Sequence, residues 1–211
     1  MPPPFPLSIH LIHPEQEACA ACRARFAKLL NVHVVQAAYP DVPLHDCFVT
    51  AGNSFGIMTA GIDAAVVGFL GASIMQAVQH HILDYYLGEQ PVGTAFILPT
   101  GNANFPFLCH APTMRVPGSI TGTDAVYCAT WAALLAVHLH NRLTPDHPVR
   151  TLAFPSMGTG FGRMTYDESA RQMAAAYQHF LAPPHRLDWD RVIERHKLIA
   201  YDGDKRVVRG G

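Results

Sequence analysis

The sequence predicts an α/β fold in which a largely parallel sheet is covered by helices on both faces. Segments with strand character alternate with segments of helical spacing along most of the chain, which is the pattern of βα units. Hydrophobic residues make up 49% of the 211 residues and charged residues 15%, so a sizeable core is available and wholesale disorder is excluded. The length predicts a single domain over 1–211, with a core at 8–182 and a helix and basic tail at 183–211.

Local composition predicts each strand. Apolar runs rich in β-branched residues are typical of strands, and prolines and glycines mark where these runs end. The third run ends at the turn-forming Gly52-Asn53-Ser54. The expected strands are 8–13, 32–38, 47–51, 93–99, 105–111 and 151–156.

Longer segments with apolar residues at helical spacing predict the helices. Pro14 stands where the first helix can start, and Thr121 or Thr123 can cap the third helical region. Asp167 and Glu168 lie in the first turn of the fourth region, where the helix dipole favours acids. The expected regions are 14–30, 60–86 with a break near Gly68 or Gly71, 123–140, 165–181, and 188–201 after a break at Pro183-Pro184.

Charge and cysteine content limit the partners. Lys and Arg total 15 against 16 Asp and Glu, and a formal charge of −1 argues against bulk nucleic-acid binding. The five cysteines are interpreted as reduced thiols of a cytoplasmic protein. Cys19 and Cys22 form a C-A-A-C pair without a second ligand pair, so we expect no metal and no cofactor. No signal peptide is evident, and the most apolar stretch, 64–78, is shorter than the ~20 residues of a membrane helix.

Two loops at the carboxyl ends of expected strands carry unusual turn chemistry, and ligands bind beyond these ends in parallel sheets. They are V-T-A-G-N-S-F-G-I-M-T-A-G-I-D-A-A-V at 49–66 and F-P-S-M-G-T-G-F-G-R-M at 154–164. In the second loop, Gly158, Gly160 and Gly162 can bring backbone N–H groups to one point beside a helix start. The pattern is neither a Walker sequence nor G-x-G-x-x-G, so it predicts either a phosphate site or a tight structural turn.

The first loop contains one acid, Asp63, at the start of an apolar helix. As a structural residue it would cap or begin the helix. As a functional residue it would orient or activate a water at the rim of an anion site. Asn53 is its natural companion, because an amide binds hydroxyls without adding charge, although Asn53 is also an ordinary turn residue.

Together the two loops resemble those of the macrodomain family, the ADP-ribose-binding modules. Macrodomains of the MacroD type carry V-N-A-A-N-S-x-L-x-G-G-G-G-V-D-G-A-I, which 49–66 match without a gap. The second loop is similar to F-P-x-I-x-T-G-x-x-G, with glycines one residue closer together here. Residues 91–100 and the run Leu108-Cys109-His110-Ala111-Pro112 resemble the family's G-x-A-x-x-T and H-A-x-x-P strands, and the order of elements agrees over most of the chain.

The resemblance implies a three-layer α/β/α fold with a mixed, mostly parallel sheet of about six strands. It implies a cleft that holds the pyrophosphate of ADP-ribose between the loops, with Phe161 packed against the distal ribose. Asn53 would contact that ribose, and Asp63 would align or deprotonate the water that attacks the anomeric carbon. Further ligand contacts are implied at Ser54, Gly61, Ile62, Ser156, Gly158, Thr159, Gly160 and Gly162.

The sequence departs from the family pattern at three places. Thr50 replaces the first Asn, and Met58-Thr59-Ala60 replaces three of four consecutive glycines, which reduces close backbone approach to the distal ribose. The Asp that binds the adenine amino group in most macrodomains is absent, because Ala38 lies in its place. Loss of such an acceptor costs about 1–3 kcal/mol and weakens adenine selectivity. Tyr39 offers a stacking face instead.

Other groups of residues give weaker predictions of a catalytic or metal site. Ser156 lacks the leading glycine of a nucleophile elbow, which argues against a serine hydrolase. The pairs His80-His81 and His138-x-His140 lack the i, i+4 spacing that places two metal ligands on one helix face. We interpret His110 as a satisfied core histidine, and Arg115 as a candidate to assist a phosphate from the same rim.

The leading hypothesis is an enzyme that hydrolyses ADP-ribosyl linkages, of the mono-ADP-ribosyl hydrolase or O-acyl-ADP-ribose type, with Asp63 and Asn53 as the catalytic pair. The alternative is a reader module that binds ADP-ribose or a related nucleotide without chemistry. A third hypothesis is a cleft adapted to another nucleotide or a nucleic-acid end. The expected partner is ADP-ribose or an ADP-ribosylated substrate. The sequence predicts neither the linkage nor the oligomeric state.

Overall fold

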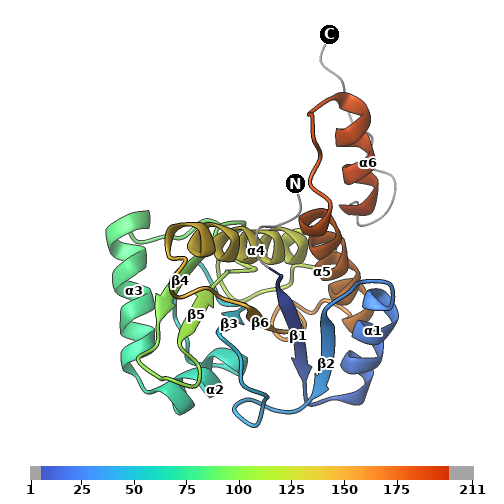
Figure 1. Cartoon of the computed structure of the whole chain (residues 1–211). Helices are drawn as coiled ribbons and strands as arrows, with labels where there is room; N and C mark the ends of the chain where they lie inside the picture. Colours follow the sequence, from blue (N-terminus) through green and yellow to red (C-terminus); the bar gives the residue numbers. More distant parts are fainter. Residues whose placement is uncertain (1–5, 200–211) are drawn as a thin grey trace.

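The computed structural model describes residues 6–199, and six strands and six helices lie in this range (Figure 1). Each element falls at its predicted place, although most are shorter by a few residues and α4 runs past the predicted end at 140. The strands are β1 (Ser8–His13), β2 (Val32–Gln36), β3 (Cys47–Thr50), β4 (Phe96–Pro99), β5 (Phe107–His110) and β6 (Thr151–Pro155). The helices are α1 (Gln16–Phe26), α2 (Gly61–Leu70), α3 (Ser73–Tyr86), α4 (Ala125–Leu143), α5 (Tyr166–Leu181) and α6 (Trp189–Ile199).

The strands form one mixed sheet in the order β2-β1-β6-β3-β5-β4. All neighbours pair in parallel except β4, which is antiparallel to β5. This confirms the predicted fold class, an α/β fold with a mostly parallel sheet. The middle strand β6 pairs with both β1 and β3. Asp46 anchors the start of this pairing, because its Oδ2 accepts the backbone N–H of Arg150 at 2.7 Å and that of Thr151 at 2.8 Å.

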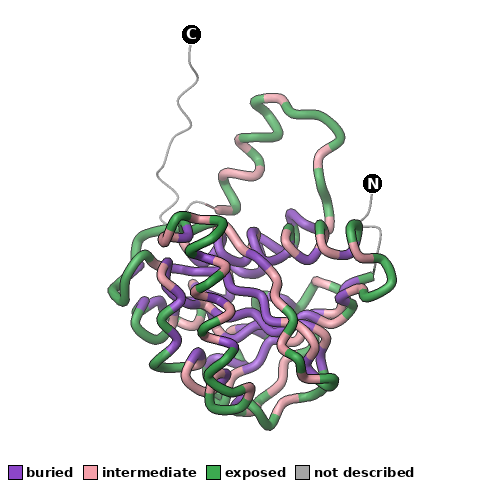
Figure 2. Tube along the Cα trace, turned by 90° about the vertical axis from the view of Figure 1, so that its left-hand side faces the viewer, coloured by how far each residue is buried: buried purple, intermediate pink, exposed green. Residues whose placement is uncertain are grey.

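Alternate residues of the central strands enter two cores, one on each face of the sheet. In β3, Val49 packs in the core formed with α1, α4 and α5, while Phe48 packs in the core formed with α2 and α3. In β6, Phe154 belongs to the first core and Ala153 to the second. The buried backbone in Figure 2 is accordingly concentrated in the sheet and the helices beside it.

The start of α4 differs from the prediction. Asp124 is the N-cap, not Thr121 or Thr123, and it makes no side-chain cap hydrogen bond. Thr123 still contributes, because its Oγ1 accepts the backbone N–H of Ala125 at 3.4 Å. By contrast, Thr165 is the N-cap of α5 and its side chain does accept a backbone N–H of the first turn.

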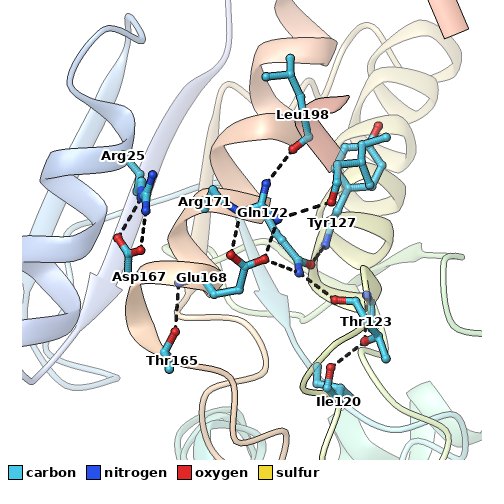
Figure 3. A network of polar contacts seen from close by, with 12 residues as sticks. Arg25, Ile120, Thr123, Tyr127, Thr165, Asp167, Glu168, Arg171, Gln172 and Leu198 are labelled. Atoms are coloured by element: carbon cyan, nitrogen blue, oxygen red, sulfur yellow. Dashed lines mark hydrogen bonds and ion pairs between the residues drawn. The ribbon is translucent and has the colours of Figure 1, made fainter. Parts of the chain in front are cut away.

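Gln172 of α5 replaces the missing cap of α4 (Figure 3). Its side chain is fully buried, and its Oε1 accepts the backbone N–H of Tyr127 at 2.9 Å. Its Nε2 donates to the Thr123 carbonyl at 2.8 Å and to Glu168 Oε1 at 2.9 Å. The Tyr127 N–H belongs to the first turn of α4, whose N–H groups have no partner within the helix. Gln172 therefore joins α5 to the start of α4.

The first turn of α5 is held from both sides (Figure 3). Asp167 accepts a hydrogen bond from Arg25 Nε of α1 at 2.8 Å. Glu168 pairs with Arg171 at 2.6 Å, and Arg171 also donates to the Leu198 carbonyl of α6 at 2.7 Å. Because α5 follows the glycine-rich loop 158–162 closely, these contacts also fix where that loop ends.

The helix α6 lies apart from the three layers (Figures 1 and 2). It has no buried residue, and it follows the break at Pro183-Pro184 that the sequence predicts. Residues 200–201 of the predicted helix and the basic tail 205–211 fall outside the described residues.

Within residues 6–199, no single helix is long and apolar enough to cross a membrane. The helices α2 and α3 reach that length and composition only as a pair, which is bent by 115° at the break near Gly71. Val66, Val78 and Ile82 of this pair are buried in the second core.

We expect Gln172→Leu to lower the free energy of unfolding by about 1–3 kcal/mol, because it leaves the buried Tyr127 N–H without an acceptor. Urea denaturation followed by circular dichroism measures the change. Gln178→Leu on the exposed side of the same helix is the matched control, with an expected change within about 0.5 kcal/mol. Equal losses in the two variants would contradict the role assigned to Gln172.

Candidate functional site

A cavity of about 670 Å³ lies at the carboxyl ends of β3 and β6, where the two loops singled out in the sequence converge. This volume is in the range of small-molecule sites. Among the described residues that line it there is no lysine or arginine, and Asp63 is the one acid. Any anion bound here would therefore be held by neutral donors. The predicted site residues that line the cavity are Asn53, Gly61, Ile62, Asp63, Ser156, Gly158, Thr159, Gly160, Phe161 and Gly162.

The loop 158–162 offers a row of backbone donors. Within residues 6–199, none of its five N–H groups makes a hydrogen bond to the protein. Gly158 has φ +72°, and an added Cβ there would lie 2.8 Å from Ile120 Cδ1. At Gly162 an added Cβ would lie 2.3 Å from the Gly158 carbonyl oxygen. Both glycines are thus required by close packing, and the loop is a tight turn as well as a set of convergent donors.

The N-terminus of α2 adds three more donors on the other side of the cavity. Its first intrahelical bond runs from the Ala64 N–H to the Ala60 carbonyl at 3.3 Å, so the N–H groups of residues 61–63 have no partner in the helix. Ala60, the N-cap, supplies no side-chain bond to them. The partial positive charge of a helix start therefore faces the cavity opposite the glycine-rich loop.

Asp63 is buried in the first turn of α2, with only 7% of its surface exposed. Its Oδ1 has no hydrogen-bond partner among the described residues. Burial raises the pKa of this carboxyl from 3.8 to about 7, and among the described residues that line the cavity there is no lysine or arginine to oppose the shift. Asp63 is thus poised to exchange a proton near neutral pH.

Behind Asp63 lies a buried histidine that the sequence analysis interpreted as satisfied. Gln90 donates through Nε2 to the carbonyls of Thr94 and His110, so its Oε1 accepts the His110 Nδ1–H at 2.6 Å. The interpretation is right for Nδ1 and wrong for Nε2, which is buried without a partner. Burial lowers the pKa of His110 to about 3, so the ring is neutral.

Gly52 separates His110 from Asp63. A Cβ on this glycine would lie 2.6 Å from His110 Nε2 and 3.2 Å from Asp63 Oδ2. Only a residue without a side chain allows the backbone of this loop to pass between the two groups. Sequence analysis missed Gly52, Gln90 and His110 as parts of the site. The G-N-S turn was the one signal that pointed near them.

Asn53 turns its side chain into its own loop. Its Nδ2 donates to the Ile57 carbonyl at 2.9 Å, and its Oδ1 accepts the N–H groups of Phe55 at 3.1 Å and Ile57 at 3.4 Å. Its backbone forms a bridge with Met114. Asn53 therefore acts as a turn residue that shapes the wall of the cavity, with one Nδ2 hydrogen left over.

Three other residues named from the sequence lie differently from expectation. Ser54 is buried and does not line the cavity. Arg115 pairs with Glu89 at 2.6 Å, packs over Phe55 and also lies outside the lining. Tyr39 does line the cavity, but the residue is only 8% exposed and its ring is packed among other aromatic rings, so little of its faces is open to a base. Phe161, by contrast, is 59% exposed at the rim, as its predicted role requires.

The chain was compared with known proteins. The family profile "Macro domain" matches residues 49–173. The chain is similar to an uncharacterized protein of Aquifex aeolicus, with 30% identity over 85% of this chain and 94% of the relative. It is also similar to a macro domain-containing protein of Cupriavidus necator, with 30% identity over 65% of this chain and 75% of the relative.

Solved structures show the same fold. The Oceanobacillus iheyensis macrodomain with ADP is similar with a TM-score of 0.56 and 20% identity, over 67% of this chain and 72% of that chain. A mutant of the same macrodomain with ADPR is similar with a TM-score of 0.56 and 20% identity, over 66% of this chain and 72% of that chain. At this identity the likeness concerns the fold alone.

The raised pKa of Asp63 predicts a pH-dependent cost to stability. Between pH 4 and pH 7 the unfolded chain releases the Asp63 proton and the folded chain retains it, so stability falls as pH rises. Asp63→Asn removes this dependence. We expect the free energy of unfolding of Asp63→Asn, relative to that of wild type, to increase by about 3–5 kcal/mol from pH 4 to pH 8. The estimate uses about 1.4 kcal/mol per pKa unit.

Denaturation at both pH values measures this difference, and Asp167→Asn is the control. Arg25 lowers the pKa of Asp167 below its ordinary value, so this carboxyl is ionised in both the folded and the unfolded chain over most of this pH range. Asp167→Asn should therefore leave the stability relative to wild type nearly unchanged between the two pH values. A relative stability of Asp63→Asn that does not change with pH would show that Asp63 titrates at its ordinary value.

Proposed function

The chain belongs to the macrodomain family, and from this premise we propose that its cleft binds ADP-ribose and hydrolyses ADP-ribosyl linkages. One observation carries the proposal: the buried carboxyl of Asp63 lines the same cavity as two groups of backbone N–H donors, those of the loop 158–162 and of the start of α2, that have no partner among the described residues. The binding half of the proposal is supported by the Oceanobacillus iheyensis macrodomain, a similar protein whose structure has been solved with ADP and, as a mutant, with ADPR.

The pyrophosphate would lie between the loop 158–162 and the start of α2. Backbone N–H groups from both sides can donate to phosphate oxygens, and the helix start stabilises their charge without a lysine or arginine. Phe161 at the rim would pack against the distal ribose. This arrangement brings the anomeric carbon of that ribose toward Asp63.

Asp63 would act as a general base. Ionised, it accepts a proton from a water held in the cleft, while the water oxygen bonds to the anomeric carbon and the bond to the modified group breaks. The proton then passes from Asp63 to the leaving group. Asn53 is the weaker member of the predicted pair, because its amide is committed to the loop. We assign it a positioning role, with its remaining Nδ2 hydrogen available to a ribose hydroxyl.

A reader module without chemistry is the second candidate. The side-chain amide of Asn53 is bonded to its own loop, and no lysine or arginine is among the described residues that line the cleft beside Asp63. Nothing then assists Asp63 in activating a water, which favours the reader module. In this case the donors of the two loops would bind the same ligand, and Asp63 would be a buried first-turn acid.

Two further parts of the proposal concern the whole protein. We place it in the cytoplasm, which the five free thiols support because such thiols persist in reducing compartments. We also assign ligand binding to the core 8–182 and treat 183–211 as an appendage, since α6 has no buried residue.

We expect Asp63→Ala to bind ADP-ribose and to lose at least about 100-fold in turnover, because general-base catalysis contributes on that order. The substrates are a mono-ADP-ribosylated protein and O-acetyl-ADP-ribose, and calorimetry measures binding separately. Wild-type turnover should rise with pH and level off above about pH 7, since the base must be ionised.

Asp146→Asn, which alters an exposed acid outside the cleft lining, is the control for turnover. Unchanged turnover in Asp63→Ala would refute the catalytic role. Binding of ADP-ribose by wild type with no turnover of either substrate would select the reader module.

The end of the cleft near Ala38, where the adenine would lie, predicts weak discrimination between purines. Among the described lining residues no carboxylate lies near Ala38 to accept the adenine amino group. Such an acceptor is worth about 1.5–3 kcal/mol, or tenfold and more in affinity. We expect ADP-ribose and its hypoxanthine analogue to bind within about threefold in calorimetry, and Ala38→Asp to restore a preference for adenine. A tenfold preference in wild type would contradict this reading.

A further inference from the structure

The helix α6 presents a charged face to the body of the protein, where a packed helix would present an apolar one. Four residues on one side of α6 line a second cavity, of about 460 Å³, and Leu198 is the one apolar residue among these four. His179 near the end of α5 and the segment 182–186 form the opposite wall. We call this cavity the α5–α6 pocket, and none of its lining residues lines the cleft. The four residues of α6 are Arg191, Glu194, Arg195 and Leu198.

His179 lines this pocket and carries a buried ring nitrogen. It is 5% exposed, and its Nδ1 lies 3.1 Å from the Tyr127 hydroxyl. Arg195 donates to the same hydroxyl oxygen at 3.4 Å, so the hydroxyl hydrogen is directed to His179 Nδ1. The ring hydrogen is then on Nε2, and this atom is buried without a partner among the described residues. A hydrogen-bond donor with no acceptor calls for an acceptor in the ligand.

The charges around His179 are mostly positive. Three arginines line the pocket and Glu194 is the one acid among the described lining residues. Arg191 pairs with Glu194 and Arg186 with Asp188, each at 2.7 Å. Arg195 has no carboxylate partner within residues 6–199, and its guanidinium lies 5.0 Å from the centre of the Trp131 ring. Its position is therefore held by an aromatic face, and no carboxylate of the described residues pairs with its charge.

We propose that the α5–α6 pocket binds a small organic phosphate, with Arg195 and His179 Nε2–H as the anchoring donors. A guanidinium group can donate two hydrogen bonds to a phosphate, and the negative charge of a phosphate ester would meet that of Arg195, the one pocket arginine without a carboxylate partner among the described residues. The cavity is larger than inorganic phosphate and within the range of small-molecule sites, which leaves room for an organic group. The proposal is independent of what the cleft does.

The two tryptophans of the chain make the pocket observable. Trp131 lies beneath Arg195, and Trp189 is the first residue of α6, whereas neither lines the cleft. We would titrate the full chain, with ADP-ribose present throughout, with pyrophosphate, AMP and citrate. Tryptophan fluorescence reports occupancy and calorimetry gives the affinities.

We expect saturable binding of AMP or pyrophosphate with a dissociation constant below about 1 mM. Arg195→Gln should weaken it by about tenfold or more, and His179→Phe should weaken it as well. Arg191→Gln changes an exposed side chain of α6 that also lines the pocket, and it should weaken binding too. It serves as the second test if either variant fails to fold. Arg142→Gln, an exposed arginine of α4 outside the pocket, should bind as wild type does.

Three outcomes would overturn the proposal. One is no saturable signal with pyrophosphate and AMP up to about 10 mM, far above the range of a specific site. Another is equal binding by Arg195→Gln and wild type. The third is citrate binding as tightly as either phosphate compound, which would show a general polyanion surface.

Discussion

The pairing of β6 with both β1 and β3 is the constraint on which the rest of the structure depends. Because all three strands are parallel, the loops that follow β3 and β6 leave the same edge of the sheet on neighbouring strands. Segments about a hundred residues apart in the chain thereby form the two walls of one cleft. Asp46 holds the two strand starts together through two backbone N–H groups, so the register of the walls is set at the end of the sheet opposite the cleft.

The described residues that line the cleft combine many backbone donors with no lysine or arginine. Its anion-binding capacity comes from backbone dipoles that the loop 158–162 and the start of α2 direct inward. The same lack of cations leaves the burial of Asp63 uncompensated and keeps its proton at pH values where an exposed aspartate is ionised. His110 cannot offset this, because it is itself neutral and bonded to Gln90. The neutral donor set for phosphate and the raised pKa of Asp63 both follow from a cavity whose described lining has no lysine or arginine.

The sequence predicts the fold and the cleft well, because strand and helix periodicity and the two glycine-containing loops are local signals. It predicts less where a side chain can bond either to a ligand or to the backbone of its own loop. Asn53 has the same residue type in either role, and only the conformation of the loop directs its amide to Ile57 and Phe55. Gln172 in place of a threonine cap, and Arg195 beside the Tyr127 hydroxyl, depend on contacts between helices far apart in sequence. The orphaned Nε2 of His110 likewise follows from tertiary packing around Gly52.

The way Asn53 binds its own loop has a thermodynamic consequence for recognition. A loop that is already ordered loses little conformational entropy when a ligand arrives, whereas ordering a free backbone costs about 1–2 kcal/mol per residue. Residues 53–57 have met this cost during folding, through three side-chain bonds from Asn53 and the bridge to Met114. The wall formed by this loop is thus a rigid template, and a ligand is accepted or rejected by its shape and not by how well it can induce closure.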